Sequence, residues 1–340
     1  MQLLVLDLEY AGDRLVAAGE RGLIAYSDDN GVSWTQAQVP VSHTLTALSF
    51  PDADNGWAVG HGGVILSTED AGATWQQQFE GGSAIQQWLG YTTSKQAALE
   101  QVLEQADASL VPELEEQLEE ILYEIEDTRI ALQSGPADPF LDVLFIDDVE
   151  GWAVGAYGLL FHTNDAGLRW RLAVAGIDNA ERFHYYQLAA ADDDTLYLSG
   201  EAGVLYRSDD AGGRWTRLPL DYDGSLFGVL ALGEDTVLCY GLRGNIFLSH
   251  DRGETWESVA PEAGAGLSLY GGAKISDEGV VLVGAGGGYL VSTDGGQTYT
   301  AQVHESRSSF AAVIEVGDRL LLGGMSGLVS APLVVSEDKQ

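Results

Sequence analysis

Basic residues and cysteine are both scarce in this chain. Of its 340 residues only 16 are lysine or arginine, against 52 aspartates and glutamates, and the formal net charge is -36. Nucleic acids and anionic lipid headgroups are bound through basic residues that displace counterions, so the composition argues against both kinds of partner. Cys239 is the only cysteine. It therefore forms no intramolecular disulfide, and a cysteine-built metal site is excluded.

Long apolar segments are also missing. No run of 18 or more apolar residues occurs, so we expect no membrane-spanning helix. No signal peptide is visible after Met1, and a strand-like stretch begins almost at once, at residues 3–6. The residues themselves therefore do not assign a compartment.

Glycine, in contrast, is abundant and recurs at regular intervals. One pattern, Ser/Thr-x-Asp-x-Gly-x-x-Trp/Tyr, is the Asp box, and it occurs six times. Its glycines are Gly31, Gly72, Gly167, Gly212, Gly253 and Gly296. A second pattern, an apolar run followed by Gly-x-x-Gly, occurs seven times. It begins at Gly19, Gly60, Gly155, Gly200, Gly241, Gly284 and Gly324. Seven repeats of about 40 residues have the size of propeller blades. We predict an all-β fold, a seven-bladed β-propeller of four-stranded antiparallel blades.

Each repeat reads as four strands, A to D from the centre outwards. The Gly-x-x-Gly segment forms the turn between strands B and C, and the Asp box forms the turn between strands C and D. An Asp-box carboxylate can accept backbone N–H groups of its own turn. Identical turns spread around a ring cannot converge on one substrate, so these aspartates are predicted to be structural. They are Asp29, Asp70, Asp165, Asp210, Asp251 and Asp294.

One interval between boxes is about 50 residues too long, and it contains a helical insertion. Apolar residues recur at helical spacing on both sides of Pro112, and Gly135 followed by Pro136 ends the second helix. We predict a single propeller domain over 1–340 with a helical hairpin at 83–135, between blades 2 and 3. Links from strand D to the next strand A share a face with the B–C turns. We expect the hairpin to cover that face; the alternative is that its helices bury each other and project as an arm.

The rare Arg, His and Tyr residues of that face are the candidate partner-binding residues. They are Arg21, His61, Tyr157, Arg182, His184, Tyr222, Arg243, His304 and Arg307. Such a ring suits a carboxylate- or phosphate-bearing partner. The alternative is that these side chains pair with acids of the protein itself, such as Glu181, Glu201, Glu305 or those of the insertion.

Catalytic and metal-binding motifs are not found. The chain has no Gly-x-Ser-x-Gly, His-Glu-x-x-His or Walker loop, and its six histidines are scattered. We predict no catalytic residues, no metal site and no cofactor. A glycosidase needs two carboxylates at a defined separation, and 52 acids offer too many candidates to choose from.

Closure of the ring concerns the seventh repeat, which keeps its Gly-x-x-Gly turn but lacks an Asp box. The N-terminal strand starts too early to supply an outer strand to that blade. We therefore expect residues 332–335 to form its strand D, with weak closure.

The repeats resemble a known family. Gly-Trp-Ala-Val-Gly at 56–60 and 151–155, followed by Gly-x-x-Gly and an Asp box, is similar to the photosystem II stability/assembly factor family. The insertion resembles that of proteobacterial members, which carry bacterial neuraminidase repeats. The resemblance implies a non-enzymatic scaffold that binds a nascent membrane protein through an arginine-lined face, and a periplasmic or secreted location. Candidates for that face are Arg21, Arg182, Arg243 and Arg307.

The leading hypothesis is a non-enzymatic protein-binding or assembly scaffold that uses the face with the Gly-x-x-Gly turns and the insertion. Its partner is expected to be a protein, such as a membrane or exported protein, and neither a nucleic-acid partner nor a membrane span is expected. The alternative is an Asp-box glycoside hydrolase or glycan-binding protein. A third hypothesis is metabolite binding in the central channel. The oligomeric state is not assigned.

Overall fold

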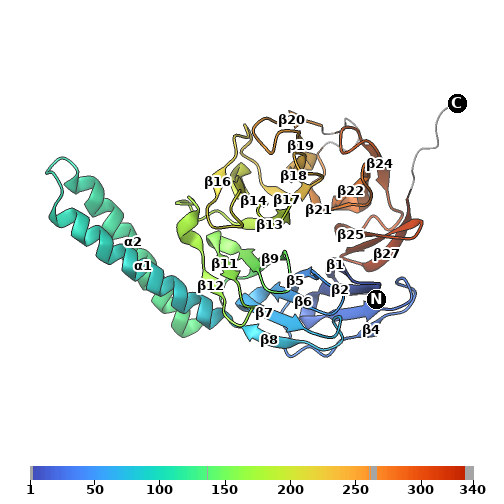
Figure 1. The fold of residues 1–340 in the computed structure, drawn as a ribbon, viewed down its shortest axis with the longest axis horizontal. Helices are drawn as coiled ribbons and strands as arrows, with labels where there is room; N and C mark the ends of the chain where they lie inside the picture. Colours follow the sequence, from blue (N-terminus) through green and yellow to red (C-terminus); the bar gives the residue numbers. More distant parts are fainter. Residues whose placement is uncertain (1–2, 136, 260, 262–265, 334–340) are drawn as a thin grey trace.

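The computed structural model describes residues 3–135, 137–259, 261 and 266–333. Its strands form seven antiparallel sheets around a central axis, and two helices extend from the ring (Figure 1). Six sheets have four strands in sequence order and the seventh has three. The predicted seven-bladed propeller with a helical hairpin between blades 2 and 3 is confirmed.

The first three blades are formed as follows. Blade 1 comprises β1 Val5–Ala11, β2 Arg14–Gly19, β3 Ile24–Ser27 and β4 Thr35–Gln36. Blade 2 comprises β5 Leu45–Ser49, β6 Gly56–Gly60, β7 Val64–Thr68 and β8 Gln76–Phe79. Blade 3 comprises β9 Phe140–Phe145, β10 Gly151–Gly155, β11 Leu160–Thr163 and β12 Arg171–Leu172.

The other four blades follow in sequence. Blade 4 comprises β13 Tyr185–Ala190, β14 Leu196–Gly200, β15 Leu205–Ser208 and β16 Thr216–Arg217. Blade 5 comprises β17 Leu226–Ala231, β18 Val237–Gly241, β19 Ile246–Ser249 and β20 Glu257–Ser258. Blade 6 comprises β21 Leu269–Lys274, β22 Val280–Gly284, β23 Gly288–Ser292 and β24 Thr300–Val303. Blade 7 comprises β25 Phe310–Val316, β26 Arg319–Gly324 and β27 Gly327–Pro332.

The hydrophobic core lies between the blades. The B strands of blades 2 to 6 are buried at every position, because each is covered by a neighbouring blade on both faces. Aromatic rings fill part of this space. Trp57 of blade 2 stacks on Phe145 of blade 3 with the ring centroids 3.5 Å apart. Burial on both faces explains why these strands read as continuous apolar runs instead of alternating ones.

Polar side chains also join the blades near the channel. Asp7 of blade 1 accepts the backbone N–H of Leu48 in blade 2 at 2.7 Å. Asp142 of blade 3 accepts the N–H of Leu188 in blade 4, also at 2.7 Å. In the same way, Ser49 joins blade 2 to blade 3 and Gln187 joins blade 4 to blade 5. These bonds satisfy buried N–H groups that no strand within the blade can reach.

Blade 7 closes the ring against blade 1. The Tyr10 hydroxyl donates to the carbonyl of Glu315 at 2.8 Å, and Arg319 donates to the carbonyl of Asn30 at 2.6 Å. Apolar residues of both blades pack in one cluster across this seam. The prediction of a fourth strand at 332–335 is wrong for Pro332, which ends the third strand β27. Residues 334–335 lie outside the described residues.

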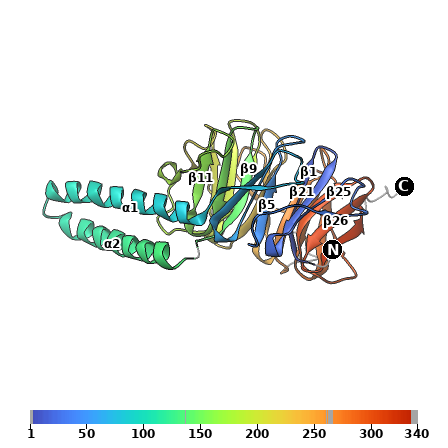
Figure 2. The same cartoon turned by 90° about the horizontal axis from the view of Figure 1, so that it is seen from below.

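The insertion forms helices α1 Gly81–Glu104 and α2 Val111–Ser134. They run outward from the ring as an arm (Figures 1 and 2). The expectation that they cover the propeller face is wrong, and the alternative holds. Ile121 and Ile125 of α2 are buried in the arm, so the two helices cover each other's apolar sides instead of the disc. Among the described residues, no helix has the length and apolar character needed to cross a membrane.

Candidate partner-binding face

The B–C turns and the D–A links share one side of the disc, here called the turn face. The turns are η1 Glu20–Gly22, η2 His61–Gly63, η3 Ala156–Gly158, η5 Glu201–Gly203, η6 Leu242–Gly244, η7 Ala285–Gly287 and, in blade 7, residues 325–326. Backbone hydrogen bonds fix the links to the turns. Glu201 N–H, for example, donates to the carbonyl of His184 at 2.9 Å. The Asp boxes lie on the opposite side, here called the box face.

The turn conformation places a side chain at the surface in the blades whose turn has a residue other than glycine at the position of Arg21. Arg21 and Gly22 both have positive φ values, 60° and 70°, as a type I′ hairpin turn requires. Tyr157 and Arg243 occupy the position equivalent to Arg21, with φ of 54° and 60°. Left-handed backbone at a non-glycine residue costs free energy, which the rigid flanking strands must offset. In return, these side chains are directed away from the sheet.

The structure brings three of the candidate residues together beside the arm. The backbone N–H of Tyr157 donates to Nδ1 of His184 at 2.7 Å, and the two rings meet edge to face at 4.7 Å. Arg182 donates to the carbonyl of Tyr157 at 3.3 Å. His184 also lies 3.9 Å from a carboxylate oxygen of Glu201. Blades 3 and 4 and the link between them therefore form one polar cluster.

Arg182 is held by the arm. Its guanidinium lies 3.0 Å from Oε1 of Glu124 and stacks over Trp88 at 4.5 Å from the ring centroid. The indole N–H of Trp88 donates to the same oxygen of Glu124 at 2.8 Å. This guanidinium is thus paired with an acid of the insertion, as the alternative expectation had it. Burial raises the pKa of Asp138 nearby, although the charges of Arg182 and His184 oppose this shift.

The other candidate residues lie around the ring, with Tyr222 beside the turn that carries Arg243 and with His304 and Arg307 in one link. Tyr222 donates to the carbonyl of Leu242 at 3.1 Å and supports a turn, and His304 contacts Ser306 and Phe310. The remaining four, Arg21, His61, Arg243 and Arg307, are exposed. Arg21 lies 3.9 Å from Glu20, whereas Arg243 and Arg307 form no ion pair within the part of the chain that the structure describes. Beyond the cluster beside the arm, the candidates therefore lie in separate groups around the turn face.

Sequence reasoning missed a set of residues at the mouth of the central channel. Each A strand begins with a β-bulge, and the extra residue lines the channel. The seven bulged residues are Leu6, Thr46, Leu141, Tyr186, Phe227, Tyr270 and Ala311. Three successive ones, in blades 4 to 6, are aromatic. Their spacing equals the repeat length, so an alignment of the repeats could have found them.

These rings continue the cluster beside the arm. His184 lies 6.4 Å from Tyr186, Tyr186 lies 5.3 Å from Phe227, and Phe227 lies 5.7 Å from Tyr270, all between ring centroids. Together with Tyr157 they form a row of five rings, here called the aromatic arc. It runs from the rim at blade 3 to the channel mouth at blade 6. Tyr157 and Tyr270 are 49% and 43% exposed, so both ends of the arc are open to a partner.

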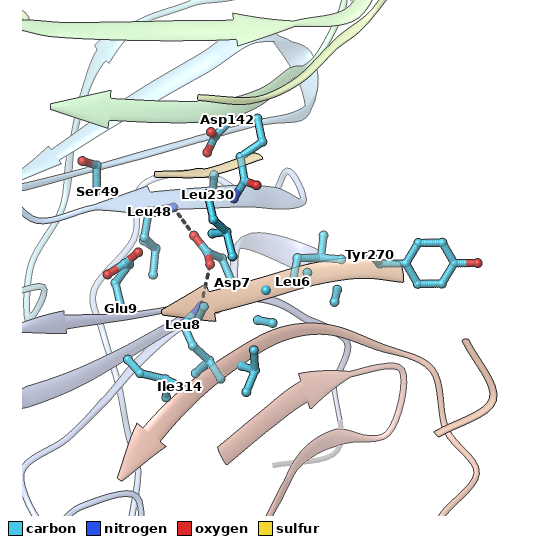
Figure 3. A pocket seen from close by; sticks show the side chains of 18 of the residues that line it. Leu6, Asp7, Leu8, Glu9, Leu48, Ser49, Asp142, Leu230, Tyr270 and Ile314 are labelled. Carbon is cyan, nitrogen blue, oxygen red and sulfur yellow. Dashed lines mark hydrogen bonds between the residues drawn. The ribbon is translucent and has the colours of Figure 1, made fainter. Parts of the chain in front are cut away.

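The channel below the arc is acidic and has a volume of about 750 Å³. Asp7, Glu9 and Asp142 line it (Figure 3). Burial raises the pKa of Asp7 to about 6 and that of Glu9 and of Asp142 to about 8, and repulsion by the neighbouring channel acids adds to the shifts of Glu9 and Asp142. Across the described ranges, no group of three or more acids, histidines or cysteines is placed to hold a metal ion.

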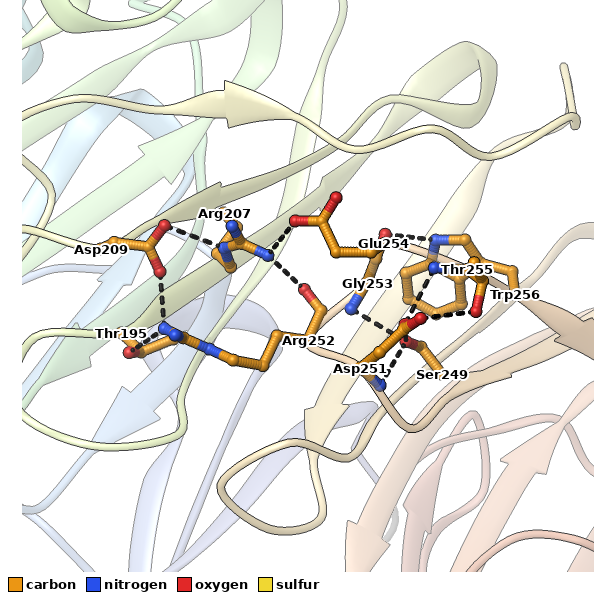
Figure 4. A network of polar contacts seen from close by, with 10 residues as sticks. All are labelled: Thr195, Arg207, Asp209, Ser249, Asp251, Arg252, Gly253, Glu254, Thr255 and Trp256. Carbon is orange, nitrogen blue, oxygen red and sulfur yellow. Dashed lines mark hydrogen bonds and ion pairs between the residues drawn. The ribbon is translucent and has the colours of Figure 1, made fainter.

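On the box face the Asp-box aspartates are engaged within their own turns. In blade 5, Asp251 accepts hydrogen bonds from Ser249 Oγ at 2.7 Å and from the N–H and Oγ1 of Thr255 at 2.8 and 2.6 Å (Figure 4). These bonds lower the pKa of Asp251 to about 2, and the bond from Oγ1 of Thr255 contributes most. Arginines of this face are engaged too: Arg207 and Arg252 both bind Asp209 (Figure 4).

Comparison with known proteins assigns the family. The family model described as "Photosynthesis system II assembly factor YCF48" matches residues 5–88 and 128–275. The photosystem II stability/assembly factor HCF136 of Guillardia theta is 38% identical over 52 residues, which are 15% of this chain and 13% of that protein. The photosystem II assembly lipoprotein Ycf48 of Synechococcus sp. (strain CC9902) is 30% identical over 128 residues, 37% of this chain and 38% of that protein. The aligned parts thus span well under half of these relatives.

Solved structures show the same fold at low identity. A structure titled "YCF48 bound to D1 peptide" has a TM-score of 0.67 at 17% identity and covers 98% of this chain and 96% of its own. YCF48 from Cyanidioschyzon merolae has a TM-score of 0.63 at 13% identity, covering 97% and 95%. A GH74 enzyme of Niastella koreensis has a TM-score of 0.65 at 13% identity, but this chain covers 53% of it. Since the family model matches more than half of the residues, the chain belongs to the YCF48 family of photosystem II assembly factors.

Proposed function

We propose that this protein is a non-enzymatic assembly scaffold that binds a segment of a client protein across the turn face. The observation that carries the proposal is the aromatic arc, five rings in succession from Tyr157 to Tyr270. Family membership supports it, because the relatives are named assembly factors and one is titled as bound to a D1 peptide. We also propose that the protein is of the proteobacterial type of this family and that it acts in the periplasm or outside the cell.

The chemistry of the arc suits an extended peptide with apolar side chains. Aromatic rings offer large contact areas with few rotatable bonds, which is why they dominate binding surfaces. His184 and the tyrosines add hydrogen-bonding groups along the row. The channel carboxylates Asp7 and Asp142 accept backbone N–H groups of the next blade, which gives them a structural role. A client is a membrane or exported protein caught before it is assembled.

A cross-linking experiment tests the site. The photoreactive residue p-benzoylphenylalanine replaces Tyr157 on the turn face or, as a control, Leu168 on the box face of the same blade. Leu168 is 79% exposed, so both positions are accessible. We expect discrete client adducts from position 157 in cells, and none from 168. Phe227→Ala combined with Tyr270→Ala should abolish those adducts. Adducts that form equally at both positions, or that survive the double substitution, contradict the proposal.

The same arc also favours the glycan-binding alternative, since aromatic faces pack against sugar rings, and a GH74 enzyme shares the fold. A glycan array and a hydrolysis screen with the full chain separate the two functions. Binding of a glycan that is lost in the double alanine variant would replace the protein client. An array without such binding leaves the scaffold as the function of the arc.

A further inference from the structure

The arm has an apolar seam that neither helix covers completely. Ile121 of α2 is buried, whereas Val102 of α1 is 54% exposed and Ile85 and Leu99 are half-buried. These residues line a groove of about 1060 Å³ that runs along both helices. Two helices bury a stripe on each other, but a pair leaves part of each stripe open, and a third helix usually closes it.

The dimensions of the groove suit one more helix. Ile85 and Val102 are 17 residues apart on α1, which corresponds to about 26 Å, or nearly five turns. At the inner end the groove meets the propeller at Leu159, Tyr157 and Arg182. It is thus open along the arm and closed at the turn face, next to the first ring of the aromatic arc.

Charge decides what kind of helix fits. Residues 81–134 contain eleven carboxylates and only two basic residues, Lys95 and Arg129. Glu120, Glu124 and Asp127 line the groove together with Lys95 and Arg182, and Arg182 pairs with Glu124, so the acids in excess lie mainly along the rim of the arm. A helix with lysines or arginines beside its apolar stripe would therefore find opposite charges on the rim. A second copy of the arm would bring eleven more carboxylates to the same place, which like-charge repulsion opposes.

We propose that the groove binds a basic amphipathic helix of a partner protein and completes a three-helix bundle with α1 and α2. This inference rests on the proposed scaffold function and extends it from the turn face to the arm. It adds a second recognition element of different chemistry. The arc selects extended apolar segments, and the arm selects a helix with a positive flank.

Synthetic peptides of about 18 residues probe the groove in the full-length chain. One fluorescein-labelled peptide has a leucine and alanine stripe flanked by lysines, a second has glutamates in place of the lysines, and a third is a scramble of the first. Fluorescence anisotropy measures binding, and circular dichroism measures helix formation. We expect the lysine peptide to bind and become helical, and the other two to bind at least about tenfold more weakly. A scramble that binds equally well overturns the proposal.

Two matched substitutions locate the binding. Val102 and Ile130 are both 54% exposed, but only Val102 lines the groove. Both lysine variants change the net charge equally. We expect Val102→Lys to weaken peptide binding about tenfold and Ile130→Lys less than twofold. Equal effects, or a dimer of the chain that only Val102→Lys abolishes, contradict the proposed occupant.

The failure of this inference and that of the proposed function are distinguishable. Phe227→Ala with Tyr270→Ala removes two rings of the arc, yet neither residue lines the groove. Peptide binding should therefore be unchanged in this variant. Because Tyr157 also lies at the inner end of the groove, only cross-links that this double variant abolishes report on the arc. Bound peptide without such cross-links would refute the client site on the arc alone. Cross-links without peptide binding would refute the third helix alone.

Discussion

At the scale of single residues, hydrogen bonds within each turn hold the box face together, and the Asp boxes show how. In blade 2, Asp70 accepts Thr68 Oγ1 at 2.8 Å, Thr74 Oγ1 at 2.7 Å and Thr74 N–H at 2.8 Å. One carboxylate thus accepts hydrogen bonds from several donors of a loop, and these donors have no partner in a neighbouring strand. The turn depends on this acid, while the proposed partner-binding residues lie on the opposite face.

The first prediction is that Asp70→Ala destabilises the propeller by about 1–2 kcal/mol, because the N–H of Thr74 loses its acceptor. Urea unfolding monitored by tryptophan fluorescence measures this free energy. Glu69→Ala is the matched control, since Glu69 is the exposed neighbour and makes no hydrogen bond through its carboxylate among the described residues. If both variants lose the same stability, the Asp-box bonds are not what stabilises the turn.

The channel carboxylates have raised pKa values, in contrast to the lowered pKa of the Asp-box residue Asp251, and they predict that the stability of the fold falls as the pH rises. Burial raises the pKa of Asp142 from its ordinary value of 3.8 to about 8. A raised pKa means that the folded state keeps a proton that the unfolded chain has lost. The stabilisation is therefore complete below about pH 4 and is lost as the pH rises through about 8.

The second prediction is accordingly that Asp142→Asn stabilises the protein at pH 8.5, by about 1–3 kcal/mol, and has little effect at pH 4. An asparagine cannot ionise, and its side-chain oxygen still accepts the N–H of Leu188. Urea unfolding at the two pH values gives the difference. Asp13→Asn, at an exposed position, serves as the control and should change neither value. A loss of stability at pH 8.5 would show that the ionised acid is needed.

The residue scale also shows what sequence can and cannot reveal. The Asp-box turns were predictable because all their partners lie within four residues. Arg182 was placed on the correct face, but its partner Glu124 is 58 residues away on the insertion, and no local pattern links them. The three rings of the arc at the channel mouth, in blades 4 to 6, were missed for another reason. They occupy β-bulges, and the bulged positions hold residues as different as Thr46 and Tyr270, so composition gives no signal.

At the scale of elements, the arm projects from the ring, and Ala84 and Trp88 near its base belong to the apolar cluster of blades 2 to 4. It is anchored at its base, where Gln87 donates to the carbonyl of Trp170 and accepts the N–H of Leu172, both at 2.9 Å. The chain leaves and re-enters the ring at almost one point, since a Cβ on Gly81 would overlap the Cβ of Ala137. Helical periodicity predicted both helices. It could not predict their direction, because an apolar stripe can be covered by the partner helix as well as by the disc.

The third prediction follows from this arrangement: deletion of residues 83–135 leaves a folded propeller. The ring loses only Ala84 and Trp88 from its described core clusters, and the ends to be joined are already adjacent. Thermal unfolding should shift by no more than about 5 °C. Circular dichroism should lose helical signal only, with the near-ultraviolet spectrum of the buried tryptophans retained. An insoluble or molten product would mean that the arm is part of the folding unit.

At the scale of the whole molecule, the excess of acidic over basic residues is the main electrostatic influence on folding stability. With a net charge of -36, most of the 52 acids have no basic partner available. The Arg residues that form ion pairs, such as Arg14 with Asp28 and Arg252 with Asp209, are too few to offset the repulsion. The compact ring brings these charges closer together than the unfolded chain does. Self-repulsion therefore opposes folding, and mobile ions reduce it by screening.

The last prediction is that salt stabilises this protein. Between 0.05 and 0.5 M NaCl the Debye length falls from above 10 Å to about 4 Å, so repulsion between surface acids is largely screened. The melting temperature in differential scanning calorimetry at pH 7 should rise by several degrees, and KCl should act like NaCl. Replacing three glutamates that are exposed on α2, Glu115, Glu116 and Glu119, by lysine changes the net charge from -36 to about -30. This variant should show a smaller salt effect. A melting temperature that falls with salt would mean that surface ion pairs, not repulsion, control the stability of the ring.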